Sequence, residues 1–486
     1  MVKNSEQPFR NKHNKQLIST IFLIALGITI YTLLSIDNDT YKLLWLLPLG
    51  YLLFTLIYYG VLAKINYNYG VVFITANIII FIRYVITPFS IVFSSSYNGL
   101  GFGPNPSESS MSLAIALMLL ELLVVYFITI FAVLHYSKKQ KSYSKINSIA
   151  ANILNNKSIV VLFMLVALPI VLVLSPDALM PNSLSSIGSN TDNFSDIQYS
   201  GLLLLIIPMI RLVFLLLSLS FIKGIYDKKN KGIAILLAWL VVFFYLSMLI
   251  STSRWSIVFS SILCMLVIAQ LFPKTPKIFY GILISMTVIV FAAISIYKFS
   301  WALDSSLNPY RDIFNVLFGQ FQEYFSGPRV VAQSLDMTEF FGSQIGISTI
   351  MNDFLGSLPF ISNFIDQTDR TNIYFNLYLE VGNVSHIIPL LGNSYAYLPL
   401  FPVFFTIIAQ WLMVRFDFKS QNEKQIEFKY IYGYIGLFFA MSMGFNVQII
   451  FGNFIAYFLF PWLLFTLNRR FTLKSITYNS NKTGGS

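Results

Sequence analysis

The sequence contains little of what soluble domains and metalloproteins depend on. Only 11% of its 486 residues are charged, and it has one cysteine, Cys264, whereas about a quarter of the residues of a typical soluble domain are charged. One cysteine excludes an internal disulfide framework and a metal site built from several thiolates. No P-loop, zinc-protease or serine-hydrolase motif is evident. ATPases, metalloproteases, serine hydrolases and thiol redox enzymes therefore lack support.

The sequence contains long apolar runs instead. Hydrophobic residues make up 56% of the chain, and a helix that crosses the bilayer core needs roughly 20 mainly apolar residues. We therefore predict an all-α, polytopic integral membrane protein with about 12 transmembrane helices, in which residues 1–486 form a single membrane domain. The first run is expected to stay as a helix, because it is long and no small-residue cleavage site follows it. The predicted spans are 17–35, 43–63, 71–93, 111–134, 159–174, 201–222, 232–251, 255–272, 278–297, 398–414, 430–445 and 447–467.

The positions of lysine and arginine indicate how these spans are oriented. Of the 32 basic residues, 24 fall on the side of the N-terminal tail, six on the opposite side and two within spans. Cytoplasmic segments carry the excess of basic residues, so both termini are predicted to be cytoplasmic. Topology thus explains the formal net charge of +11. The basic charge would be the main evidence for a nucleic-acid partner. Because topology already explains this charge, no nucleic-acid partner is expected.

One predicted external segment is much longer than the others. It covers residues 298–397, between the ninth and tenth spans, and long loops in compact proteins are usually functional. Apolar residues recur at helical spacing from Ile313 to Phe325, which predicts an amphipathic helix. Its polar side chains, with Arg311 and Glu323 among them, are expected to face a lipid-linked substrate at the outer membrane surface. The alternative is a helix that only packs on its neighbours.

Three ionisable residues, Arg83, Glu121 and Arg211, lie inside the predicted spans. A charge at the centre of a membrane helix costs about 2.5–3.5 kcal/mol on insertion scales, so each is expected to have a function or a partner. Glu121 is the one intramembrane carboxylate that can pair with either arginine. If it pairs with one, the other is left for an anionic ligand such as a phosphate. Arg83 and Arg211 are both candidates for a diphosphate site.

The predicted external side offers further candidates. Arg254 lies in a connection so short that its side chain is expected at the outer membrane edge, within reach of a diphosphate. The alternative is an interfacial arginine that contacts lipid phosphates. Arg329 and Arg370 lie in the large loop, and His386 is the one histidine on this side. A histidine can accept a proton near neutral pH from an attacking sugar hydroxyl, although a lone histidine is more often structural.

Several of these features resemble one family of membrane enzymes. The topology, the late external loop, the Ser253-Arg254 pair that opens a span and the run from Tyr324 to Gly327 are similar to Wzy-type polysaccharide repeat-unit polymerases. The segment from Ile388 to Tyr395 is similar to the end of their large loop. The resemblance covers most of the chain, and its motifs are short.

The resemblance implies a metal-independent glycosyltransferase of the bacterial cytoplasmic (inner) membrane. Such an enzyme joins oligosaccharide units carried on undecaprenyl diphosphate outside the cytoplasm, without a cofactor or nucleotide sugar, and makes a capsule, O-antigen or other exopolysaccharide. The growing chain is the donor, and its diphosphate leaves when a hydroxyl of the next unit attacks. Related ligases use external arginines and a histidine, and by this resemblance Arg254, Arg329, Arg370 and His386 are the residues expected to fill such roles here. The spacing around His386 departs from the ligase pattern.

The resemblance also implies partners: membrane lipids, a chain-length regulator and a flippase. Three alternatives to a polymerase stay open. A lipid-linked oligosaccharide flippase or other transporter would use a similar number of helices, but it predicts charged residues through the bundle and helices broken by glycine or proline. An O-antigen-type ligase would use a similar external site. A non-catalytic scaffold of an export complex would tolerate replacement of the loop arginines.

Overall fold

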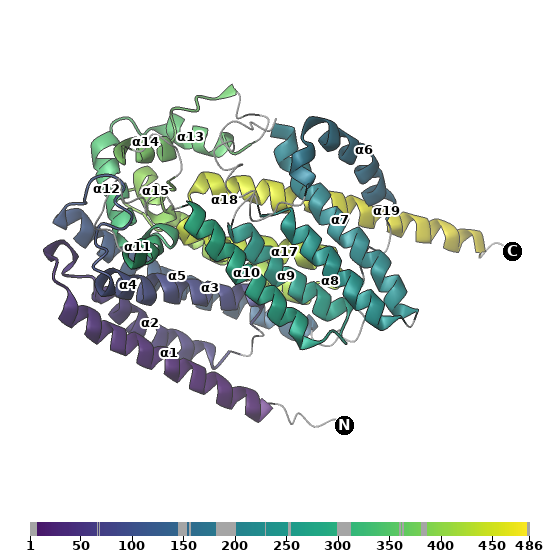
Figure 1. The fold of residues 1–486 in the computed structure, drawn as a ribbon, viewed down its shortest axis with the longest axis horizontal. Helices are drawn as coiled ribbons and strands as arrows, with labels where there is room; N and C mark the ends of the chain where they lie inside the picture. The colour runs from purple at the N-terminus through teal and green to yellow at the C-terminus, as the bar shows by residue number, and fades with distance from the viewer. Residues whose placement is uncertain are drawn as a thin grey trace.

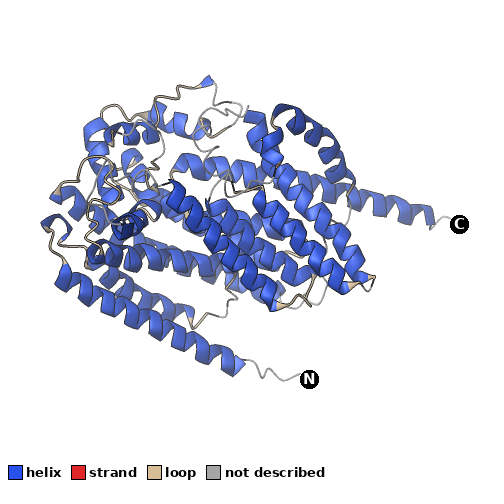
Figure 2. Cartoon of the chain, in the orientation of Figure 1, coloured by secondary structure: helices blue, strands red, loops and turns tan. Residues whose placement is uncertain are grey.

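Helices account for the regular secondary structure of the described chain. The computed structural model describes residues 7–65, 67, 69–143, 153–154, 157–180, 201–228, 230–250, 254–298, 313–358, 361, 364–380 and 386–483. Within these ranges no strand occurs (Figure 2). A helix satisfies its own backbone hydrogen bonds, which is what a chain without water around it requires. The predicted all-α class is confirmed.

Each predicted span overlaps a helix or a run of consecutive helices (Figure 1). The third span is α3 (Val71–Phe81), the π-helical segment η2 (Ile82–Ile86) and α4 (Thr87–Phe93), and the last is α18 (Val447–Phe454), η9 (Ile455–Leu459) and α19 (Phe460–Thr483). The others are α1 (Gln7–Ser35), α2 (Leu46–Leu62), α5 (Glu108–Tyr143), α6 (Ser158–Leu174), α7 (Gly201–Asp227), α8 (Lys231–Ser247), α9 (Arg254–Leu271), α10 (Lys277–Lys298), α16 (Phe404–Asn422) and α17 (Ile426–Ala440).

By length and hydropathy the chain is a multi-pass membrane protein. Among the described residues, seven helices are long and apolar enough to cross a membrane. Three shorter apolar helices, α1 from Ser19, α6 and α8, join them. The helices α16 and α17 fall in neither group. The seven are Asp39–Leu62, Val71–Phe93, Glu108–Lys139, Gly201–Asp227, Arg254–Leu271, Lys277–Ser295 and Val447–Phe471.

The centre of the bundle is α17. Every residue of this helix except Lys429 is buried, and it packs against α3, α9, α16 and α19. Two glycines allow the close approach: a Cβ at Gly433 would lie 2.5 Å from the Leu263 side chain, and one at Gly436 would lie 2.9 Å from Val72. The outer helices instead expose large apolar side chains, such as Val288 of α10 at 61%. This arrangement suits a lipid environment.

The helix α16 begins six residues later than its predicted span. Pro399 and Pro402 precede it, and residues 398–403 form turns, so that α16 starts at Phe404. A proline lacks the backbone N–H that a helix interior needs and restricts the residue before it. The two prolines therefore shift the beginning of the helix to Phe404. The large loop becomes longer at its C-terminal end.

The described part of the large loop is itself helical. It contains α11 (Ile313–Tyr324), α12 (Pro328–Phe341), α13 (Ile347–Leu355), α14 (Thr371–Tyr378) and α15 (Leu390–Tyr397), which gather at one end of the bundle (Figure 1). The predicted helix is confirmed as α11. It packs on α4, and a Cβ at Gly319 would lie 2.9 Å from the Gly99 carbonyl oxygen. Contact with its neighbours therefore defines the position of α11.

Candidate functional site

A sharp turn between α11 and α12 places two predicted site residues together. Ser326 adopts a left-handed conformation, with φ of 47°, and the Gly327 amide donates to the Gln322 carbonyl oxygen at 2.7 Å. This bond closes the C-terminus of α11, and Pro328 occupies the first turn of α12, where its missing N–H costs nothing. The end of α11, with Glu323, therefore faces the beginning of α12, with Arg329.

The carboxylate of Glu323 lies between a guanidinium and an imidazole. Its Oε1 lies 3.7 Å from Arg329 Nη1, and its Oε2 lies 3.7 Å from His386 Nδ1. Both distances exceed a hydrogen bond, but they are short enough for charge attraction in a poorly hydrated site. The Arg329 side chain is 1% exposed, that of Glu323 11% and that of His386 12%. We call these three residues the Glu323 cluster.

A glycine-rich loop between α4 and α5 holds the cluster. The Phe102 carbonyl oxygen accepts hydrogen bonds from Arg329 Nη2 at 2.6 Å and Gln333 Nε2 at 2.9 Å. The Phe102 ring packs on His386, with 3.8 Å between ring centroids. Gly99 has a φ of +50°, and a Cβ there would lie 3.2 Å from Glu323 Oε1. Our sequence reasoning missed this loop, although Gly99, Gly101 and Gly103 alternate along it.

Asparagines of α14 fix the backbone around His386. The His386 amide donates to Asn376 Oδ1 at 3.1 Å, and Asn376 Nδ2 donates to the His386 carbonyl oxygen at 2.9 Å. One turn earlier, Asn372 Oδ1 accepts from the Ile388 amide at 3.0 Å and from Asn446 Nδ2 at 3.2 Å. The histidine is thereby tied to the residue that caps α18. Sequence reasoning missed these asparagines, which the i, i+4 spacing could have suggested.

Arg254 reaches the residue next to Glu323. Its guanidinium carbon lies 4.1 Å from the ring centroid of Tyr324, and its Nη1 donates to Ser295 Oγ at 3.1 Å. The side chain therefore links the beginning of α9 to α10 and to the end of α11. Because Tyr324 follows Glu323, Arg254 and Arg329 contact adjacent residues. The structure thus brings together three predicted site residues, Glu323, Arg329 and His386, and places Arg254 against the neighbouring Tyr324.

Arg370 lies in a second polar group, at the beginning of α14. Asp353 Oδ2 accepts hydrogen bonds from the Thr371 amide at 3.2 Å and from the Tyr397 hydroxyl. A side chain at Gly356 would overlap the Arg370 guanidinium, whose Nε and Nη2 have no hydrogen-bond partner among the described residues. Burial raises the pKa of the Asp353 carboxyl and lowers the pKa of Arg370. The two residues lie close enough to interact electrostatically.

The intramembrane arginines lie elsewhere. Arg83 Nη2 lies 3.0 Å from Glu121 Oε2, and both side chains are fully buried. The Tyr84 hydroxyl donates to Glu121 Oε2 and the Thr406 hydroxyl to Oε1, each at 3.1 Å. Glu121 therefore pairs with Arg83, one of the two pairings left open by the sequence. Arg211 donates from Nε and Nη2 to the Ala178 carbonyl oxygen, and Arg311 lies outside the described residues.

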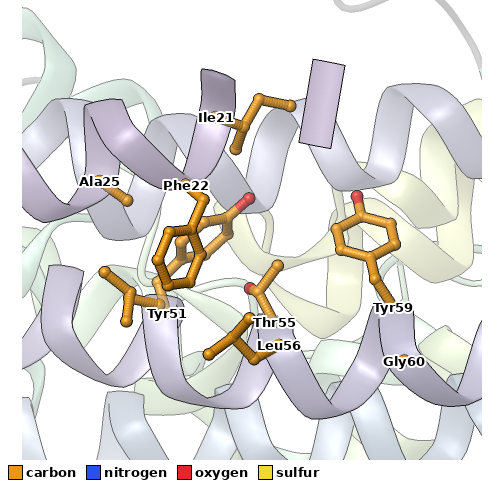
Figure 3. Close-up of a pocket in the computed structure, with 9 residues that line it drawn as sticks. Ile21, Phe22, Ala25, Tyr51, Thr55, Leu56, Tyr59 and Gly60 are labelled. Carbon is orange, nitrogen blue, oxygen red and sulfur yellow. The ribbon is translucent and has the colours of Figure 1, made fainter. Parts of the chain in front are cut away.

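A cavity of about 240 Å³ lies between α1 and α2 (Figure 3). Phe22 and Ala25 of α1 face Tyr51, Thr55 and Tyr59 of α2 across it, and Figure 3 shows the tyrosine rings bordering the space. The lining is mainly apolar and shares no residue with the Glu323 cluster. The cavity therefore adds no reacting group to the candidate site.

The donor set of the described residues also bears on metals. No group of three or more histidine, cysteine, aspartate or glutamate side chains in the described ranges is arranged to hold a metal ion. In the Glu323 cluster two cationic or protonatable groups flank one carboxylate, which favours an anion or a proton over a metal. Compared with known proteins, the chain matches no family model, no curated protein and no solved structure.

Proposed function

We propose that this protein is a membrane glycosyltransferase that polymerises oligosaccharide units carried on a lipid diphosphate. The observation that carries the proposal is the Glu323 cluster, in which a buried arginine and a histidine share one carboxylate. In this proposal the chain spans the bacterial cytoplasmic membrane about twelve times and the large loop lies outside. The product is a surface polysaccharide, and undecaprenyl diphosphate is the carrier that the sequence resemblance implies.

The distribution of charge and the position of the loop support this orientation. Most basic residues precede or follow spans on the side of the N-terminal tail, which is typical of cytoplasmic segments. Figure 1 shows both chain ends away from α11, α12, α14 and α15. The Glu323 cluster then lies on the outer side, where nucleotide sugars are absent and a lipid-linked donor is required.

The proposed reaction is a single displacement. A hydroxyl of the acceptor unit attacks the anomeric carbon of the donor, the new glycosidic C–O bond forms, and the bond to the diphosphate oxygen breaks. His386 takes the hydroxyl proton, and Glu323 stabilises the resulting imidazolium. The leaving diphosphate keeps the bonding electron pair, and arginine is suited to stabilise its charge by paired hydrogen bonds.

Arg329 is the arginine best placed for this role. Its Nη2 is held by the Phe102 carbonyl oxygen, whereas Nε and Nη1 have no hydrogen-bond partner among the described residues. Both donors are buried as well as unpaired, and in the proposed reaction a diphosphate oxygen that enters the site accepts hydrogen bonds from them. Arg254, beside Tyr324, and Arg370, at the beginning of α14, are proposed to contact other parts of the lipid-linked substrate.

The test is reconstitution of purified protein in nanodiscs with the host's undecaprenyl-diphosphate oligosaccharide, with product length measured on a gel. The proposal predicts a ladder of products that increases with time. His386→Gln is expected to abolish the ladder, and His135→Gln, at an exposed position of α5, is the control expected to keep it. Folded protein with authentic substrate and no ladder would contradict the proposal.

A lipid-linked oligosaccharide transporter is the second candidate, because the membrane region has features that transport requires. The Arg83–Glu121 pair is buried there, and Arg83 lies in the π-helical segment η2. Pro169 lies inside α6 and Pro208 inside α7, and helices that contain glycine or proline line the sites of many transporters. Movement of labelled substrate across vesicles, without elongation, would favour this candidate. An O-antigen-type ligase would instead transfer the glycan to a different acceptor in the same assay.

A further inference from the structure

The helix α13 has its polar side inside and its apolar side outside. Thr349 and Asp353 are buried at 0% and 2% exposure, and Thr349 Oγ1 donates to Asp369 Oδ1 at 2.6 Å. In contrast, Ile347 is 79% exposed and Met351, one turn later, is 54% exposed. A helix on a water-covered surface shows the opposite pattern, because its apolar face packs inward. The outer face of α13 therefore calls for an apolar environment.

The position of α13 indicates what that environment is. Phe354 at its C-terminal end packs on Phe405 of α16, with 6.1 Å between ring centroids, and on Phe451 of α18, at 5.6 Å. The helix thus lies across the loop-side ends of two bundle helices, beside α18 in Figure 1. Phe404 and Ile408 of α16 are themselves 37% and 41% exposed. The apolar face of α13 continues the outer apolar surface of the bundle.

We infer that α13 is an interfacial helix that inserts its Ile347 and Met351 face into the leaflet of the membrane on the side of the large loop. An amphipathic helix of this kind buries its apolar side roughly 5–10 Å into the boundary between headgroups and acyl chains. The partner is the lipid surface itself. Leu400, which is fully exposed, and Phe401, which is 47% exposed, lie in the segment that precedes α16 and extend the same surface.

Insertion has a consequence for the large loop. The Arg370 guanidinium packs against Gly356, directly after α13, so an inserted α13 holds Arg370 at headgroup depth. Asn372 and Asn376 of α14 then connect this plane to the backbone around His386. The inference does not depend on the proposed reaction, because a transporter or a scaffold with this structure would insert the same helix.

Spin labelling of full-length protein in nanodiscs of phosphatidylethanolamine and phosphatidylglycerol tests the inference. The single cysteine is buried, so Cys264→Ala provides the background for nitroxides at Ile347→Cys and Met351→Cys. Two matched controls are Val288→Cys, on the exposed face of the predicted span α10, and Glu339→Cys, on the exposed part of α12. Collision with oxygen reports lipid, and collision with the water-soluble complex NiEDDA reports water.

We expect the labels at positions 347 and 351 to show a ratio of oxygen to NiEDDA collision several-fold above that of the Glu339→Cys label and close to that of the Val288→Cys label. A ratio equal to that of the Glu339→Cys label would overturn the inference, because it places the face in water. Low collision with both reagents would also overturn it, since a second copy or another protein would then cover α13. Two independent label positions guard against one that misfolds.

Discussion

Two buried arginines, each beside a glutamate, occupy different environments in this molecule. Arg83 and Glu121 lie 3.0 Å apart with no exposed surface, and Tyr84 and Thr406 satisfy the remaining carboxylate positions. Arg329 lies 3.7 Å from Glu323, and the same carboxylate also faces His386. The first glutamate has three close protein partners, whereas the second is shared between two looser partners within the large loop.

The difference shows how the same residue types serve separate purposes. A close, desolvated pair between η2 and α5 joins spans, and its removal leaves a charge in a region that cannot hydrate it. In the looser Glu323 cluster, Arg329 Nε and Nη1 have no hydrogen-bond partner among the described residues, so they are the donors that an anionic ligand would use. We therefore expect substitutions in the first pair to change stability and substitutions in the second to change activity.

The largest expected effect is that of His386→Gln on activity. Loss of a general base typically lowers the rate by about 10²- to 10⁴-fold, while the thermal unfolding midpoint should stay near that of the wild type, because the backbone of residue 386 is held by Asn376. Initial rates of elongation and thermal unfolding in detergent measure the two quantities. Wild-type rates in the variant would remove His386 from the mechanism and leave it as a structural residue.

The next effect is that of Glu121→Leu on stability. This change leaves Arg83 buried without its carboxylate, which typically costs about 3–5 kcal/mol. The double variant Arg83→Met/Glu121→Leu removes both charges and should recover most of the loss, as shown by unfolding titrations of the three proteins. If the double variant were stable but inactive, the pair would belong to the reaction or to a transport path. Its assignment to stability alone would then be wrong.

A smaller effect is expected for Arg329→Lys. Lysine keeps the charge but lacks the planar fork of donors, so one charge-assisted hydrogen bond worth about 1.5–3 kcal/mol is lost, or roughly a ten- to hundredfold decrease in kcat/KM. Arg415→Lys, in α16 and away from the cluster, is the control. An equal decrease in both variants would show that the assay responds to arginine loss in general.

The smallest expected effect is a change in how the stability of the folded protein depends on pH. It arises from Asp353 in the second polar group. Because burial raises the pKa of Asp353, the folded protein binds this proton more tightly than the unfolded chain does. The associated stability is present below the ordinary carboxyl pKa of about 4 and is lost as pH rises through the raised value. As pH rises above about 4, the unfolding midpoint of Asp353→Asn should therefore decrease less steeply than that of the wild type. Parallel curves for variant and wild type would contradict this assignment.

Local patterns predicted the helices well, because apolar runs and helical periodicity depend on near neighbours along the chain. The helix α11 followed from its spacing, and the late beginning of α16 was foreseeable from Pro399 and Pro402. The choice of Arg83 as the partner of Glu121 depends on how three helices are rotated, which the sequence does not specify. The pairing was therefore an open alternative until the packing of η2, α5 and α16 was known.

The sequence suggested residues that the structure brings into contact, Glu323, Arg329 and His386, but not how they are held together. Arg329 and His386 could be selected by charge, side and chemistry, yet the contact that orders both comes from Phe102, more than 200 residues earlier in the chain. Such a contact follows from tertiary packing, which no local pattern encodes. The alternating glycines that begin at Gly99 were the available signal, since glycine often marks a close approach of backbone.

The most direct test of the account compares elongation by two matched proteins in the same nanodiscs, Arg329→Ala and the double variant Arg83→Met/Glu121→Leu. We predict that Arg329→Ala folds but gives no ladder of products, whereas the double variant gives a ladder like that of the wild type. A ladder from Arg329→Ala together with its loss in the folded double variant would place the reacting group in the membrane pair and contradict the account.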